Sequence, residues 1–274
     1  MVSASPTERE LVAIAAKLRA SAVKMVYRAK ASHIGSCLSI ADIMAALYFD
    51  VLKISPQTVA EPDRDRFILS KGHAAAMQYA ALAERGFIEH EQLNTYCEND
   101  SPMTGHVNYA IEGVEVATGS LGHGLPIGCG MALAADEHKY RVFVLLSDGE
   151  LDEGSNWEAI LFAAHHKLDN LVAIVDYNKI QSFGTVKEVL DLDPLAQKFA
   201  DFGWAVRSID GHNMAEVSAA LHSIPHEKGK PTAIIANTVK GKGISFMENT
   251  LDWHYKSPSP EQLEQALAEL ESVR

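Results

Sequence analysis

Two short apolar runs, each leading into a polar side chain, constrain this chain most strongly. Residues 142–146 lead into Ser147-Asp148-Gly149-Glu150, and residues 171–175 are followed by Asn178, 30 positions after Asp148. Runs rich in β-branched residues, separated by a helix-length stretch, predict a strand–helix–strand unit with parallel strands. Asp148 and Asn178 are therefore expected at matching carboxyl ends of two strands, the edge at which open α/β sheets bind ligands.

The residue types at this edge suit one kind of ligand. A carboxylate and an amide oxygen are ligands that Mg2+ accepts, and Gly149 leaves room for a diphosphate to approach the backbone. The pattern predicts a site for a magnesium ion held between the protein and a diphosphate.

Length and pattern predict one large α/β domain over residues 1–274, with a doubly wound, mostly parallel sheet flanked by helices. We find no internal repeat, low-complexity segment or Pro-Ser linker that would mark a domain boundary. Helices are expected over residues 8–30, 39–50, 74–85, 126–135, 153–166 and 260–273, and further strands over 66–70, 204–209 and 232–236. Thr7 and Glu10 form a capping-box pattern at the start of the first helix, which is an amino-terminal extension.

Composition disfavours several classes of partner. The chain has 24 Lys plus Arg against 36 Asp plus Glu, a net charge of −12, so its surface should repel nucleic acid and anionic membranes. Neither a signal sequence nor an apolar run long enough to span a membrane is expected. The three widely spaced cysteines predict neither a disulfide framework nor a zinc cluster, and a reducing cytoplasm fits them best.

The Asp148-Gly149 pair followed by Asn178 resembles the thiamine-diphosphate signature, and residues 8–256 resemble the amino-terminal third to half of transketolase. Ser147 departs from the family, which usually has glycine there. The resemblance implies the thiamine-diphosphate-binding fold. It also implies that Asp148, Asn178 and the backbone carbonyl of Ile180 hold Mg2+, or Ca2+ or Mn2+ in its place, and that Gly149 borders the cofactor.

Four histidines lie beside glycine or at a predicted strand end: His33, His73, His106 and His254. Each alone is more often structural, but all four match histidines around the cofactor and sugar site of transketolases. The resemblance implies catalytic contacts to sugar oxygens for His33, His106 and His254, and places His73 nearer the diphosphate. An ordinary pKa near 6.5 suits imidazole to proton shuttling between hydroxyl and carbonyl groups.

Further cofactor contacts follow from the same resemblance. Gly119 and Leu121 match a segment that runs past the cofactor rings, although a tight turn before a helix would look the same. Glu153 and Glu158 match glutamates that link paired sites near a subunit interface, with compensation of the helix dipole as the alternative. The turn at residues 240–243, Lys-Gly-Lys-Gly, resembles one near the diphosphate, with a solvated turn equally acceptable.

One part of a transketolase site has no counterpart in this sequence. The pyrimidine-binding domain, which carries the glutamate that activates thiamine, would follow the region of resemblance and is expected on a separate chain. We therefore expect an amino-terminal subunit that assembles with a carboxy-terminal one into a dimer of heterodimers. Together they would transfer a two-carbon ketol unit from a ketose phosphate to an aldose phosphate, as in pentose phosphate metabolism.

Other functions remain open from sequence alone. The chain could be the alpha-type subunit of a 2-oxo acid dehydrogenase, or resemble deoxyxylulose-phosphate synthase. Gly122-x-Gly124-x-x-x-Gly128, with Asp148 ending the next strand, also fits a nicotinamide-dependent dehydrogenase, although residues 113–118 make a poor buried strand. A non-catalytic regulatory subunit is the remaining alternative.

Overall fold

The fold is built on one five-stranded parallel sheet. The computed structural model describes residues 5–136 and 139–272. The strands lie in the order β1-β2-β3-β5-β4, and every neighbouring pair is parallel. Their bounds are β1 (Arg66–Leu69), β2 (Val142–Ser147), β3 (Leu171–Tyr177), β4 (Ala205–Asp210) and β5 (Thr232–Asn237). The predicted fold class and each of the predicted strands are confirmed, with ends that differ by two residues at most.

Alternating residues of the central strands feed two separate hydrophobic cores. On β2, Phe143 and Leu145 pack into one core, whereas Val142, Val144 and Leu146 pack into the other. Because successive side chains of a strand point to opposite faces, an uninterrupted apolar run requires cover on both faces. The apolar composition of these strands is thus the reason that the sheet is wound on both sides.

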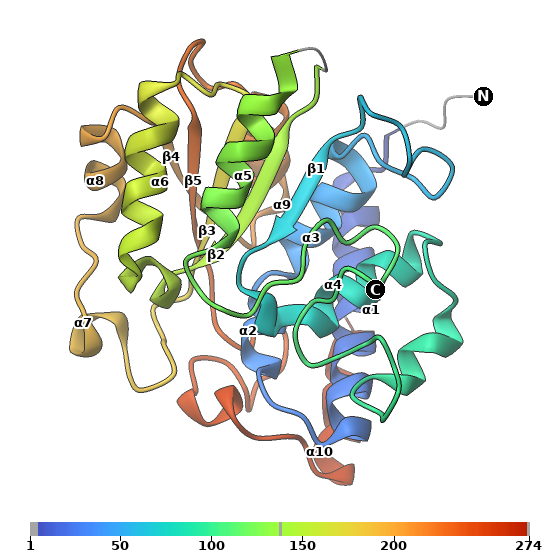
Figure 1. Cartoon of the computed structure of the whole chain (residues 1–274). Helices are drawn as coiled ribbons and strands as arrows, with labels where there is room; N and C mark the ends of the chain where they lie inside the picture. Colours follow the sequence, from blue (N-terminus) through green and yellow to red (C-terminus); the bar gives the residue numbers. More distant parts are fainter. Residues whose placement is uncertain (1–4, 137–138, 273–274) are drawn as a thin grey trace.

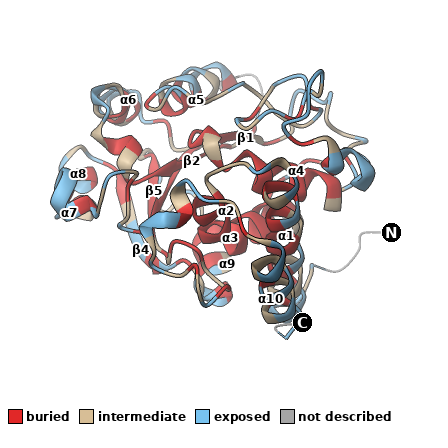
Figure 2. Cartoon of the chain, turned by 90° about the horizontal axis from the view of Figure 1, so that it is seen from below, coloured by how far each residue is buried: buried red, intermediate tan, exposed pale blue. Residues whose placement is uncertain are grey.

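Helices form a layer on each face of the sheet (Figure 1, Figure 2). The first layer contains α5 (Gly124–Leu133), α6 (Gly154–His165) and α8 (Leu195–Asp201). The second contains α1 (Glu8–Ala29), α2 (Ile34–Ser39), α3 (Ala41–Ala46), α4 (Ala75–Glu84) and α9 (Met214–His222), with α10 (Pro260–Glu271) packed against α1. The short α7 (Val186–Val189) lies in the connection after β3.

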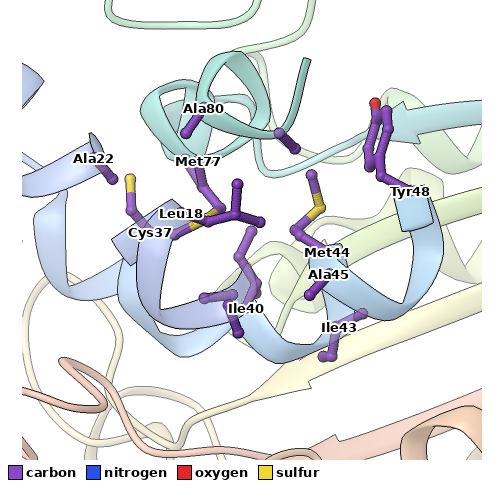
Figure 3. Close-up of a cluster of buried hydrophobic side chains, with 14 of the residues drawn as sticks. Leu18, Ala22, Cys37, Ile40, Ile43, Met44, Ala45, Tyr48, Met77 and Ala80 are labelled. Atoms are coloured by element: carbon purple, nitrogen blue, oxygen red, sulfur yellow. The ribbon is translucent and has the colours of Figure 1, made fainter. Parts of the chain in front are cut away.

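The second layer holds the larger core. Leu18 of α1, Met44 of α3 and Met77 of α4 meet there with at most 1% of each residue exposed (Figure 3). Burying a side chain of this size stabilises the folded chain by roughly 1.5–3 kcal/mol. This well-packed layer therefore supports the loops that follow β1 and α1.

The first two helical regions of the chain differ in how closely they follow the sequence pattern. The first helix has the expected Thr7–Glu10 capping box and ends at Ala29, with Lys30 in the left-handed region. The helix predicted over residues 39–50 is found as α3 and the π-helical turn over Leu47–Val51 that continues it. The preceding helix α2, which begins at Ile34, and the break at Ile40 were not predicted. Residues 34–48 are all buried, so no polar face marks the helical period.

The remaining helix predictions are confirmed with ends shifted by one or two residues, and Gly86 follows α4 with φ 81° as expected of a stop. The predicted end of the last helix, at Val273, lies outside the described residues. Helices α7, α8 and α9 were not predicted. Within residues 5–136 and 139–272, none of the helices has the length and hydropathy to span a membrane.

Candidate active site

A cavity of about 410 Å³ lies at the carboxyl edge of the sheet, where the sequence predicts it. Eleven of the twelve predicted site residues line it, namely His33, His73, His106, Gly119, Leu121, Asp148, Gly149, Glu153, Asn178, Ile180 and His254. These residues come from seven separate stretches of the chain. The fold therefore brings together what sequence spacing alone could only suggest.

Strand register places the two central polar side chains. Ser147 on β2 pairs with Asp176 on β3, so Asp148 and Asn178 follow at neighbouring strand ends. The Asp148 carboxylate accepts the backbone N–H of Gly149 at 2.7 Å and that of Lys179 at 2.6 Å. Burial, with the charge of Asp176 nearby, raises the pKa of Asp148 to about 6. A cation in the cavity would favour its charged form.

Asp176, which sequence reasoning missed, orients Asn178. The Asn178 Nδ2 group donates to Asp176 at 2.9 Å, and the amide oxygen Oδ1 accepts the N–H of Ile180 at 3.1 Å. This bonding fixes which end of the amide is the oxygen. A polar residue inside an otherwise apolar strand run was the available signal for Asp176.

Three oxygens at this edge could hold a divalent cation: the Asp148 carboxylate, the Asn178 amide oxygen and the Ile180 carbonyl. Hard oxygen donors of mixed charge are what Mg2+ or Ca2+ takes in proteins. The Ile180 carbonyl already accepts a cationic donor, the Lys240 Nζ, at 2.8 Å. Among the described residues no group of three His, Cys, Asp or Glu side chains could hold a metal ion, so this mixed oxygen set is the candidate.

The four predicted histidines form one cluster. The His33 ring centroid lies 5.2 Å from His73, 5.9 Å from His106 and 5.1 Å from His254. Burial, with neighbouring imidazoles and lysines, lowers the pKa of His33 to about 4 and that of His254 to about 3. The pKa values of His73 and His106 are also lowered, chiefly by burial. Near neutral pH the cluster is therefore uncharged and can both donate and accept hydrogen bonds.

Two further contacts orient the histidine rings. Lys240 Nζ lies 2.9 Å from His254 Nδ1, and an ammonium can only donate, so the ring proton of His254 is on Nε2. The Ser32 hydroxyl lies 3.0 Å from His33 Nδ1. Ser32 therefore contacts the ring directly.

The Lys240 side chain lies inside the protein and not in solvent. The alternative of a solvated turn at residues 240–243 is wrong at Lys240, because this residue is 1% exposed and lines the cavity. Burial and the charge of Lys71 lower the pKa of Lys240 to about 8. Lys242, two positions later, is partly exposed and pairs with Glu248 at 3.4 Å.

The turn over residues 119–122 is fixed by close packing and by one buried acid. A Cβ on Gly119 would lie 3.1 Å from the His106 ring, so glycine allows the two to approach. Glu150, fully buried, accepts from the Ser70 hydroxyl at 2.5 Å and from the Gly122 N–H at 3.0 Å. This carboxyl was not predicted as a site residue, yet it ties the turn to the end of β2.

Glu153 and Glu158 lie in different surroundings. Glu153 occupies the N-cap position of α6, without a capping hydrogen bond from its side chain, and lines the cavity. Glu158 does not: it borders a groove between α5 and α6 beside Pro126 and Phe162. Five positions along a helix correspond to a rotation of about 140° beyond one full turn, which carries Glu158 away from the cavity.

Comparison with known proteins decides the family. Residues 11–269 match the family model described as "Transketolase, thiamine diphosphate binding domain". The chain belongs to the transketolase family. The predicted resemblance to transketolase, the thiamine-diphosphate-binding fold and the enzyme class are thereby confirmed.

Several transketolase relatives are similar over nearly the whole chain. It is 43% identical over 256 residues to an apulose-4-phosphate transketolase subunit of Phocaeicola vulgatus, covering 93% of this chain and 91% of that protein. It is 43% identical over 242 residues to the 6-deoxy-6-sulfo-D-fructose transketolase subunit SqwG of Clostridium sp., covering 87% of this chain and 88% of that protein. The crystal structure of Campylobacter jejuni transketolase superposes with a TM-score of 0.89 at 31% identity, covering 96% of this chain and 43% of that one.

Transketolase membership also removes the nicotinamide alternative, and the structure gives the reason. Residues 113–118, which would have to form the strand before a dinucleotide-binding turn, are turns and irregular backbone. The glycine-rich stretch therefore opens α5 without a preceding strand, unlike a dinucleotide-binding unit.

Proposed function

We propose that the cavity holds thiamine diphosphate through a divalent cation, Mg2+ in the simplest case, bound by Asp148, Asn178 and the Ile180 carbonyl. The buried Asp148 carboxylate carries the proposal, because the groups that donate to it are the neutral backbone N–H groups of Gly149 and Lys179. A cation there would supply a directly bound positive charge. The Lys240 ammonium and His73, on the cavity wall, would face the anionic diphosphate.

The bound cofactor supplies the carbanion chemistry of two-carbon transfer. This chain's part is to hold the sugars and to move protons. His33, His106 and His254 line the same wall as neutral imidazoles. His254, with its proton on Nε2, can donate a hydrogen bond to a sugar carbonyl or hydroxyl oxygen, and a neighbouring ring with a free nitrogen can accept a hydroxyl proton.

The partner we infer is a carboxy-terminal transketolase subunit with the pyrimidine-binding domain, in a dimer of heterodimers. Each of the two relatives above is named a transketolase subunit, and each aligns over most of its own length. Exposed apolar side chains border the cavity: Phe183 is 84% exposed and Val189 is 40% exposed. Such side chains at an open site are suited to contact with another protein.

The substrates we propose are a ketose phosphate as donor and an aldose phosphate as acceptor, with pentose phosphates as the first candidates and the cytoplasm as the compartment. The names of the relatives specify apulose 4-phosphate and 6-deoxy-6-sulfo-D-fructose, which share a ketose with an anionic group. A neutral histidine wall recognises hydroxyl oxygens and leaves recognition of the anionic group to other residues.

Transfer activity in the complex captured from its native cells on the tagged chain tests this function. Xylulose 5-phosphate with ribose 5-phosphate, and apulose 4-phosphate with glyceraldehyde 3-phosphate, are supplied with thiamine diphosphate and Mg2+. Turnover that is lost on stripping the co-captured chain, and separately on chelating the metal, is expected. Turnover unchanged without the partner would overturn the two-chain assignment, and a complex that binds no thiamine diphosphate would indicate a regulatory subunit.

A further inference from the structure

A largely enclosed histidine outside the cavity joins three parts of the fold. His212 lies in the connection between β4 and α9, with 12% of its side chain exposed. Its Nδ1 is 2.8 Å from Asp42 Oδ2 on α3, and its Nε2 accepts the backbone N–H of Val239, after β5, at 2.8 Å. Because the Val239 N–H can only donate, the ring proton must be on Nδ1, and the Nδ1–H group donates a hydrogen bond to Asp42. The ring is thus a neutral bridge of fixed orientation.

The acid that holds His212 is itself held firmly. Arg19 of α1 donates to both oxygens of Asp42, at 3.1 and 2.5 Å, and about 8% of each side chain is exposed. Burial alone would raise the pKa of Asp42, but Arg19 and His212 lower it to about 2. A two-point contact between guanidinium and carboxylate sets the orientation of the carboxylate and also stabilises its negative charge. Helices α1, α3 and α9 pack side by side in this layer (Figure 2).

The other end of the bridge leads into the cavity. Lys240 follows Val239, and its Nζ reaches the Ile180 carbonyl at 2.8 Å and His254 Nδ1 at 2.9 Å. The next residue, Gly241, donates its N–H to the Gly35 carbonyl at 3.0 Å and has φ 81°. The start of this turn is therefore held by His212, and its end by the backbone of α2.

We propose that His212 is a positioning residue: held by Asp42, it fixes the Val239–Lys240 turn and so places the Lys240 ammonium between the Ile180 carbonyl and His254. The inference rests on the proposed binding of thiamine diphosphate in this cavity. It assigns a role in cofactor affinity to a side chain that does not line the cavity.

Two near-isosteric substitutions separate the two bonds of the ring. In His212→Gln, the side-chain oxygen can reach the place of Nε2 and accept the Val239 N–H. In His212→Asn, the side-chain amide can take the place of Nδ1 and donate to Asp42, but nothing accepts from Val239. The reference variant is Lys240→Met. The matched control is His222→Asn, which removes a surface histidine whose Nε2 is 2.7 Å from Asp50.

The experiment is a calorimetric titration of thiamine diphosphate, with Mg2+, into each assembled complex, alongside its unfolding temperature. We expect Lys240→Met and His212→Asn each to weaken binding about tenfold or more, as loss of an outer-shell partner does. His212→Gln should remain within about threefold of wild type, and His222→Asn should not differ from it.

Equal affinity of wild type and His212→Asn, in a complex that is folded, would overturn the positioning role and leave His212 structural. Equal losses in His212→Gln and His212→Asn, with lowered unfolding temperatures, would overturn it as well. Failure of the wild-type complex to bind the cofactor is a different result, because it would refute the proposed function itself.

Discussion

Lys71 and Asp176 form a fully enclosed ion pair across the end of β2. The Lys71 Nζ lies 2.5 Å from Asp176 Oδ2, and neither side chain has any exposed surface. Burial alone would raise the pKa of Asp176, but Lys71 and hydrogen bonds from Thr238 and Ser39 bring it below its usual value. Because Lys71 follows β1 and Asp176 is on β3, the pair joins two strands that are not neighbours. It stands directly behind Asn178, which Asp176 orients.

Lys71→Met should therefore destabilise the chain strongly. The substitution leaves a buried carboxylate without its cation, which typically costs about 3–5 kcal/mol in the free energy of unfolding. Chemical denaturation measures it. Lys17→Met, which removes an ion pair to Glu84 that is about half exposed on the lysine side, should cost at most about 1 kcal/mol. Similar losses in the two variants would show that burial of the Lys71 pair has no special role.

Two glycines of the same helix, α5, should respond in opposite ways to alanine. A Cβ on Gly124 would lie 2.5 Å from the Ser70 Cβ, pushing away the hydroxyl that binds Glu150, whereas one on Gly130 would meet open space. We expect Gly124→Ala to lower the free energy of unfolding by about 1–3 kcal/mol. Gly130→Ala should leave it unchanged or raise it by up to about 1 kcal/mol. Denaturation of both variants checks the contrast, and equal effects would contradict it.

The parts of this fold that follow from local pattern were predictable. Apolar strand runs and the Asp148–Asn178 spacing place the cavity edge, because strand period and parallel connection together determine which residues end at that edge. Twelve site residues were predicted from these patterns or from the family resemblance, and eleven of them line one cavity. The break at Ile40 was not predictable, since a helix buried on all sides has no polar face to show its period.

Contacts between residues far apart in the sequence could not be predicted from local patterns either. Asp42 and His212 are 170 positions apart, and Lys71 and Asp176 are 105 apart. Nothing local distinguishes a buried, paired charge from an exposed one, because burial depends on which helices and strands pack around it. Glu158 shows the same dependence: helical rotation carries it away from the cavity that its sequence neighbour Glu153 lines.

Asp148→Asn should remove metal-dependent cofactor binding while leaving the complex assembled. The variant keeps the shape of the side chain but lacks the charge that would bind the cation, so we expect affinity for thiamine diphosphate with Mg2+ to fall by more than about a hundredfold. Titration calorimetry of the complex measures this loss. Asp152→Asn, on the wall of the same cavity, serves as the control and should stay within about threefold of wild type. Comparable losses in both would refute the specific role of Asp148.

The histidine cluster should make the stability of the chain fall in mild acid. The pKa values of His33, His73 and His254 lie below their ordinary value of 6.5, so between about pH 6.5 and 4 the unfolded chain binds more protons than the folded one. The free energy of unfolding therefore decreases as pH falls through this window. Asp148 opposes this below about pH 6, because its raised pKa lets the folded chain bind a proton first.

Urea denaturation at about pH 7 and about pH 5 tests the sign of this effect. His254→Gln removes one of the depressed groups, so its loss of stability between the two conditions should be smaller than that of wild type. His90→Gln, which removes an exposed histidine 3.6 Å from Glu84, should behave as wild type does. A wild-type chain that gains stability on acidification would contradict the neutral cluster.

Phe183 should matter to assembly and not to the fold of the chain itself. Its side chain is 84% exposed at the cavity border, so Phe183→Ser removes no core packing, and the free energy of unfolding of the isolated chain should change by less than about 0.5 kcal/mol. If the partner subunit covers this border, the same change removes a buried aromatic contact and should weaken association about tenfold or more. Phe183→Leu, which keeps an apolar side chain, should lose less. Sedimentation of the mixed subunits measures association, and an unchanged affinity in Phe183→Ser would place the partner on another face of the chain.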